Sequence, residues 1–373
     1  VVVLMRTGAE GNDLPYDMSR YGGSADENYL ELNKDEKELL AEVHKAFDKV
    51  IVLISSANAM QMDFVDKAEY GIDAVLWYAR PAGGIGSIAK ILSGAINPSG
   101  RLVDTYVHDN MSSAAMQNFG DYRYVNEDGT LSGYSYVNYA EGIYVGYKYY
   151  ETRYFDAVMG QGNANSAAGA TQGSAWNYSD EMLYTFGHGL SYLDYTQTIK
   201  SVTVDRSVNG NITAVVEVKN NSNQDGKFLT QLYVQQPYTD YDRTNLVEKS
   251  AVMFLNSAKV DVAAGKSKEV TITIPTKYLA SYDANNAKTY ILDAGDYYFT
   301  AAAGAHEAVN NILAAQGKTV ADGMDAAGSK AVVSWKLDQL DNTTFAIANN
   351  TTVTNVADDA DLNYWLPGTV TYL

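Results

Sequence analysis

Residues 1–13 read VVVLMRTGAEGND, an apolar run that ends abruptly in a polar, glycine-rich turn. The apolar run, Val1–Met5, predicts a buried strand. The turn after it carries Arg6, Glu10 and Asp13. Proteins that alternate strands and helices place their chemistry on the loops at the ends of such strands. This turn is therefore the first candidate for a functional site, with Glu10 as its most reactive carboxyl group.

The sequence continues to residue 106 with alternating strand and helix patterns. Continuous apolar strands joined by helices are typical of a parallel sheet that is covered on both faces. About four strands are predicted, fewer than is usual for such a sheet, so we expect a partial α/β sandwich domain over residues 1–106. The further strands are IVLIS at 51–55, DAVLWY at 73–78 and RLVDTY at 101–106, and the helices lie at 35–50 and 83–94.

Composition excludes several classes of function. The 373 residues include 27 basic and 45 acidic side chains, and the net charge of -18 argues against nucleic acid or an anionic membrane as a partner. No run of about 18 apolar residues predicts a membrane span. The chain has no cysteine, which excludes disulfides and thiolate metal sites. No metal or cofactor is expected.

Tyrosine is unusually frequent, with 30 residues against 9 phenylalanines. Tyrosine suits surfaces that are half apolar and half wet. A sugar-binding cleft is one such surface, and the tyrosine-rich exterior of a secreted protein is another. Acidic charge, the lack of cysteine and abundant tyrosine favour an extracellular or cell-surface location over the cytoplasm. The composition leaves the oligomeric state open, a homo-oligomer included.

The rest of the chain divides into three segments. Residues 107–195 are rich in tyrosine and glycine and are predicted to connect two domains. Residues 196–303 carry apolar side chains at alternate positions in short runs separated by turns, which predicts an antiparallel β-sandwich. Residues 304–373 form an extension with one predicted helix, at 305–317.

Rival sites are weaker. The stretch GGIGS at 83–87 has no Walker lysine and does not match G-x-G-x-x-G. Glycines that let the 83–94 helix pack closely on the sheet explain it better, with Ile85, Ile88, Ala89 and Leu92 facing that sheet.

Other catalytic or metal-binding motifs are missing from the sequence. No G-x-S-x-G elbow occurs. Four histidines lack metal-ligand spacing, and the acidic cluster Asp358, Asp359 and Asp361 fits a solvated turn better than a calcium loop.

Glu10 has the surroundings that acid–base chemistry needs. A carboxyl group on a strand-end turn can give and take a proton. Gly8 and Gly11 let the backbone bend and leave room for a ligand. Arg6 and Asp13 could orient the turn by pairing with each other. The residues alone leave open that Glu10 is an ordinary surface glutamate.

The same stretch resembles the R-x-x-G-E-G-x-D motif in the α/β-sandwich domain of glycoside hydrolase family 3, with Ala9 before the acid where serine-glycine is usual. Four further stretches resemble family segments in the same order, over about residues 1–300. The last of them is similar to the fibronectin type III-like module of the family. These stretches are the block from LISSANAM to NPSGRLVDTY, EGIYVGYKYYETRY, LYTFGHGLSYL and VKNNSNQDGKFLTQLYVQQP.

The resemblance implies part of a retaining, exo-acting β-glucosidase that hydrolyses β-linked glucose or a related sugar at a non-reducing end. It places the general acid/base on Glu10. Arg6 and Asp13 are weak candidates for substrate binding and are expected rather to hold the turn. The nucleophile of the family is an aspartate on a (β/α)₈ barrel, which needs about 250 residues and is not expected in this chain.

The tail DADLNYWLPGTVTYL resembles the segment that precedes the barrel in domain-permuted members of the family. We therefore expect the front part of a permuted enzyme, inactive alone, whose partners are a β-linked oligosaccharide and the missing barrel domain. The alternative is a non-catalytic carbohydrate-binding or scaffolding protein that kept these modules. A second alternative, nucleotide binding at Gly83–Gly86, would require measurable nucleotide affinity.

Overall fold

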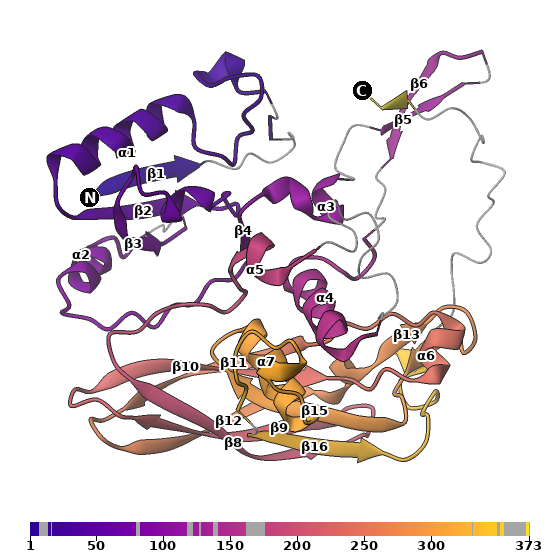
Figure 1. Cartoon of the computed structure of the whole chain (residues 1–373). Coiled ribbons are helices and arrows are strands. Elements are labelled where there is room, and N and C mark those ends of the chain that lie inside the picture. Colours follow the sequence, from indigo (N-terminus) through magenta and orange to yellow (C-terminus); the bar gives the residue numbers. More distant parts are fainter. Residues whose placement is uncertain are drawn as a thin grey trace. The chain divides into compact units, whose positions relative to one another are not determined.

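The chain forms two compact units in the computed structural model (Figure 1). The first comprises Val1–Met111 and Trp176–Tyr192, and the second comprises Ser112–Ala175 and Leu193–Leu373. Segment 107–195 thus contributes to both units. The structure describes residues 1–6, 14–15, 17–79, 83–117, 122–126, 128–136, 141–161, 176–329, 331–348, 351–353 and 371–372.

A parallel sheet is the framework of the first unit. Its strands are β1 (Val2–Arg6), β2 (Val50–Ser56) and β3 (Ile72–Trp77), in the order β1-β2-β3. Helix α1 (Lys34–Ala46) connects β1 to β2, and helix α2 (Gly86–Leu92) follows β3. The first three predicted strands and both helices are confirmed, so this unit has the α/β class expected from the sequence.

One face of this sheet is covered. Leu4 of β1 and Ile54 of β2 are buried against Leu40 of α1, which is fully buried. On the opposite face of β1, Val3 and Met5 are 49% and 58% exposed. Within the part of the chain that the structure describes, the prediction of a sheet covered on both faces is therefore wrong for β1.

Helix α2 does not bury its apolar side chains as predicted. Ile85 and Leu92 are 64% and 37% exposed. The strand before it, β3, is the edge strand of the described sheet, and its Ala74 is exposed, so it offers little apolar surface for the helix. The close-packing explanation of GGIGS is also wrong, because a side chain added at Gly83, Gly84 or Gly86 would meet no atom within 4 Å.

The predicted fourth strand, RLVDTY, does not join the parallel sheet. The backbone of Leu102 instead pairs with a turn of the same unit, where its N–H donates to His188 and its carbonyl accepts from Gly187. Only the last residue of the stretch is in a strand, β4 (Tyr106–Val107), which pairs antiparallel with β7 (Met182–Tyr184) after the short helix α5 (Tyr178–Glu181).

The second unit is built on an antiparallel β-sandwich, as the period-two pattern predicted. One sheet has the order β12-β9-β8 and the other β11-β10-β15-β16. Phe228, Leu232 and Phe299 lie in the fully buried core between them. The strands are β8 (Tyr195–Val204), β9 (Asn211–Asn220), β10 (Gly226–Gln235), β11 (Met253–Val262), β12 (Ser267–Pro275), β15 (Gly295–Ala302) and β16 (Val332–Leu337).

Helices cover the outer face of the larger sheet. Helix α7 (Ala305–Ala315), predicted from the sequence at 305–317, packs on β15, β10 and β16 and beside α4 (Tyr147–Met159) (Figure 1). Because of this cover, β10 is buried on both faces, and its outward side chains Gln231 and Tyr233 are 2% and 0% exposed. The second unit therefore has two hydrophobic layers rather than one.

Short elements complete the described chain, and none of its helices is long and apolar enough to cross a membrane. The helices are α3 (Ala114–Gln117) and α6 (Asp240–Asn245), and the strands are β5 (Tyr122–Val125), β6 (Leu131–Tyr136), β13 (Ser281–Asp283), β14 (Thr289–Ile291), β17 (Ile347–Ala348), β18 (Thr351–Thr352) and β19 (Thr371–Tyr372).

Candidate active-site edge of the first unit

The carboxyl ends of β1, β2 and β3 meet at one edge of the parallel sheet, which is where such sheets place ligands and chemistry. Segment 7–13, which follows β1 in the sequence, lies outside the described residues together with its candidates Glu10 and Asp13, as do residues 80–82. The structure describes the strand ends at this edge and the residues that hold them.

Arg6, the last residue of β1, is the centre of that support. Its side chain is 6% exposed and forms a bidentate pair with Glu36, in which Nη1 and Nη2 each lie 2.6 Å from a carboxylate oxygen. Nε donates to the carbonyl of Tyr29 at 2.7 Å and Nη2 to that of Glu31 at 2.6 Å. With the bond from Nη1 to Met5, all five guanidinium donors are used. Arg6 therefore anchors the strand end.

Glu36 can hold Arg6 because it is itself fixed at the start of α1. Asn33 caps the helix by accepting from the Glu36 N–H at 2.9 Å, and the Glu36 carboxylate accepts from the Asn33 N–H at 3.0 Å. This reciprocal capping box sets the position of the helix. One carboxylate thus joins the first turn of α1 to the end of β1. The spacing Asn-x-x-Glu at 33–36 is a sequence signal for this capping box, although it was not among the features used to predict the site.

Serines and a tryptophan order the ends of the neighbouring strands. Ser55 donates to the carbonyl of Ala79 at 2.7 Å, and Trp77 donates to the carbonyl of Ser56 at 3.0 Å. Ala79 has a φ of 53°, a left-handed conformation that alanine rarely adopts. Strained backbone of this kind collects at ligand sites. These residues were not predicted as part of the site, although the pair Ser55–Ser56 at the end of an apolar strand is a visible signal in the sequence.

A second acidic group lies near this edge. Burial raises the pKa of Glu31, whose carboxylate accepts from the side-chain amide of Asn28 at 2.5 Å. Close by in sequence, Glu27 pairs with Lys37 at 2.6 Å, and this hydrogen bond lowers the pKa of Glu27. The raised pKa means that the Glu31 carboxyl keeps its proton more readily than an ordinary glutamate. Glu31 therefore serves as an internal control for Glu10.

The other candidate stretches are not catalytic constellations. Gly84 adopts a φ of 80°, so this glycine of GGIGS is explained by its turn. The acidic cluster at 358–361 lies outside the described residues. Over the described ranges, no three His, Asp or Glu side chains gather in a way that could hold a metal ion.

Two family models match the chain. Residues 1–147 match the glycosyl hydrolase family 3 C-terminal domain, and residues 229–305 match the fibronectin type III-like domain. Residues 1–147 are therefore similar to the C-terminal domain of glycosyl hydrolase family 3. The first match includes the sheet edge, Arg6 and the turn with Glu10, and the second lies within the sandwich. The expected α/β domain followed by a fibronectin type III-like module is thereby confirmed.

Curated proteins similar to this chain include β-glucosidases. A β-glucosidase of Ruminococcus albus is 28% identical over 312 residues, which cover 80% of this chain and 28% of that protein. Thermostable β-glucosidase B of Acetivibrio thermocellus is 27% identical over 273 residues, 73% of this chain and 30% of that protein. The chain therefore spans less than a third of the length of these relatives.

Solved structures of β-glucosidases are also similar to this chain. A β-glucosidase from Paenibacillus barengoltzii superposes with a TM-score of 0.62 at 25% identity, over 91% of this chain and 30% of that one. β-Glucosidase 3B from Thermotoga neapolitana, solved with α-D-glucose, gives 0.59 at 22% identity over 91% and 37%. The second likeness concerns the fold alone.

Proposed function

We propose that this chain supplies the general acid/base, Glu10, of a retaining β-glucosidase. The observation that carries the proposal is the family 3 match over residues 1–147, which contains Glu10 just beyond the anchored end of β1. Arg6 supports it, because a strand end held by five hydrogen bonds is a rigid base for the turn. Rigid support of this kind is what a catalytic group requires.

In the proposed reaction, Glu10 protonates the glycosidic oxygen while an aspartate nucleophile attacks the anomeric carbon. The bond to the leaving group breaks, and a covalent glycosyl-enzyme forms. Glu10, now a carboxylate, then takes a proton from water as that water attacks the same carbon, and the sugar leaves with retained configuration. The two carboxyl groups must lie about 5–5.5 Å apart for this sequence.

The nucleophile is proposed to come from a (β/α)₈ barrel domain of the same polypeptide, with β-linked glucosides or related sugars as substrates. It follows that the 373-residue chain alone does not hydrolyse glucosides. Arg6 acts as a positioning residue in this scheme. Asp13 is proposed to hold the turn.

The test is Glu10→Gln in the complete enzyme, assayed on substrates with poor and with activated leaving groups. Loss of the acid should cut kcat on cellobiose by about 10²–10⁴-fold, and the loss should be smaller for an activated aryl glucoside, whose leaving group needs no proton. Glu31→Gln is the matched control and should retain activity. Unchanged turnover of cellobiose by Glu10→Gln, or a larger loss in Glu31→Gln, would overturn the assignment.

A further inference from the structure

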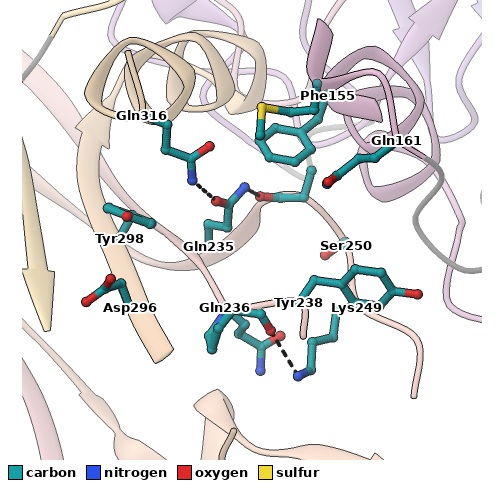
Figure 2. A pocket seen from close by; sticks show the side chains of 13 residues that line it. Phe155, Gln161, Gln235, Gln236, Tyr238, Lys249, Ser250, Asp296, Tyr298 and Gln316 are labelled. Atoms are coloured by element: carbon teal, nitrogen blue, oxygen red, sulfur yellow. Dashed lines mark hydrogen bonds between the residues drawn. The ribbon is translucent and has the colours of Figure 1, made fainter. Parts of the chain in front are cut away.

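A polar pocket is lined entirely by residues of the second unit. Its volume is about 340 Å³. Its walls come from the end of α4, the end of β10, the segment at 249–251, the start of β15 and Gln316 just after α7 (Figure 2). This volume is at the small end of the range for ligand sites, which suits a ligand of one or two sugar rings.

Glutamine amides line the pocket in a fixed arrangement. Gln235 donates to the carbonyl of Ala251 at 2.8 Å and accepts from Gln316 at 2.7 Å, as Figure 2 shows. The carbonyl oxygen of Gln316 is buried and has no hydrogen-bond partner within the described part of the chain. A buried acceptor without a donor costs free energy. A ligand hydroxyl group is the simplest donor that could satisfy it.

The inner wall carries no charge that a ligand could use. Lys249 is 2% exposed, and its ammonium donates to the carbonyl of Pro237 at 3.0 Å and pairs with Asp242 and Asp293. Its three donors are therefore committed. Asp296, at the start of β15, is an exposed carboxylate. This arrangement disfavours anions and favours a neutral ligand that donates hydrogen bonds.

Ring surfaces complete the lining. Phe155 of α4 is 5% exposed, and Tyr298 of β15 is half-buried. Aromatic rings pack against the apolar face of a ligand whose edge carries polar groups. Pyranose rings have such an apolar C–H face and a rim of hydroxyl groups. Amides, a carboxylate and rings in one small pocket together match that chemistry.

We propose that this pocket is a secondary binding site for a neutral hexose or a short oligosaccharide, held by Gln316, Asp296 and Tyr298. The lining residues all belong to the second unit and do not include Glu10, so this proposal does not depend on the proposed catalytic role. It would give the second unit a function of its own, which is to bind substrate or product sugar.

The experiment uses Met159, which lines the pocket and carries a methyl group. The purified chain, labelled with ¹³C at the methionine methyl groups, is titrated with glucose and with cellobiose up to about 50 mM, enough to detect a site of millimolar affinity. The Met159 signal, assigned with Met159→Leu, should shift and saturate with at least one of the two sugars. The signal of Met5, in the first unit, should stay unchanged.

Substitutions distinguish sugar binding in the pocket from sugar binding elsewhere on the chain. Gln316→Leu should weaken binding about tenfold, and Asp296→Asn, at an exposed position, about threefold to tenfold. Gln224→Leu, an exposed glutamine elsewhere in the same unit, is the matched control and should bind normally, as should Glu10→Gln. The proposal is overturned if neither sugar shifts Met159 saturably, if inorganic phosphate alone does so, or if the shift is unchanged in both Gln316→Leu and Asp296→Asn.

Discussion

Strand β1 of the first unit and strand β10 of the second differ in how they are buried. In the sequence β1 is a continuous apolar run that ends in Arg6, whereas β10 mixes apolar with polar residues. Even so, β1 has one covered face while β10 is covered on both, because α7 lies on its outer side. The second unit therefore contains within the described residues what it needs to bury its strands. The first unit leaves Val3 and Met5 exposed. The difference indicates that the proposed catalytic edge belongs to the unit whose sheet is less completely covered by its own described residues.

The largest expected effect comes from truncating the core of the second unit. Phe299 is 0% exposed between the sheets. Phe299→Ala should lower the free energy of unfolding by about 3–5 kcal/mol, because a buried cavity replaces the ring. Val3→Ala, on the open face of β1, should change it by less than about 0.5 kcal/mol. Urea denaturation of each variant, with hydrogen exchange measured in β10 and β1, compares the two losses of stability. Equal losses would show that the open face of β1 is covered in solution.

Arg6 and Lys249, one buried cation from each unit, extend the same comparison. Lys249→Met leaves Asp242 and Asp293 buried without their ammonium partner and should cost about 3–5 kcal/mol in the second unit. Arg6→Met should cost less, about 1–3 kcal/mol, because Glu36 keeps its place in the capping box and its side chain is 17% exposed. Unfolding in urea of each single variant measures both values. A larger loss from Arg6→Met than from Lys249→Met would contradict this ranking.

A loss of stability above neutral pH is expected in the second unit. His306 of α7 lies 2.8 Å from Glu151 of α4 and 2.7 Å from Asp325. Burial alone would lower the pKa of His306, but the two carboxylates outweigh burial and raise it to about 10. The imidazolium therefore stabilises the fold fully below its unfolded pKa of about 6.5, and this stabilisation is lost as pH rises towards about 10.

We expect the second unit to lose on the order of 5 kcal/mol across that window. Urea unfolding at several pH values, with hydrogen exchange of α7 as the local readout, measures the loss. His306→Asn should flatten the profile. The assignment is wrong if the wild-type profile is already flat or if the variant loses stability over the same window as the wild type.

The smallest effect concerns the loop before α2. Gly84 has a φ of 80°, so Gly84→Ala should cost about 1 kcal/mol. Gly83→Ala is the matched control, because Gly83 is not among the glycines with positive φ and an added side chain there meets open space. Thermal unfolding of the two variants compares them. Equal melting temperatures would refute a conformational role for Gly84.

The sequence predicted the layered parts of the molecule best. In β9 and β12, apolar and polar side chains alternate because one face of each strand is buried. The apolar pattern of α7 likewise follows from the burial of that helix. RLVDTY was misassigned because Leu102 and Val103 look like a buried strand, whereas the Leu102 backbone pairs with Gly187 and His188. Periodicity reports which side chains are apolar, and it does not report which distant backbone supplies the hydrogen bonds.

Support for the candidate site was harder to foresee. Glu36 meets Arg6 across 30 residues, and Glu151 meets His306 across 155. Such pairs depend on the tertiary fold, so no local pattern shows them. The asparagine-to-glutamate spacing at 33–36 was the exception, since it predicts a helix start from sequence. Glu10 and Asp13 rest on the family resemblance and remain predictions.

The most direct test of the central claim, that Glu10 is the acid/base, is azide trapping in the complete enzyme with Glu10→Ala. A glycosyl-enzyme that forms but lacks its base should be released by added azide. Turnover of an activated aryl glucoside should then rise, and the product should be β-glucosyl azide, seen by NMR with the configuration of the substrate retained. If azide neither raises turnover nor appears in the product, or if the product has inverted configuration, Glu10 is not the acid/base of a retaining enzyme.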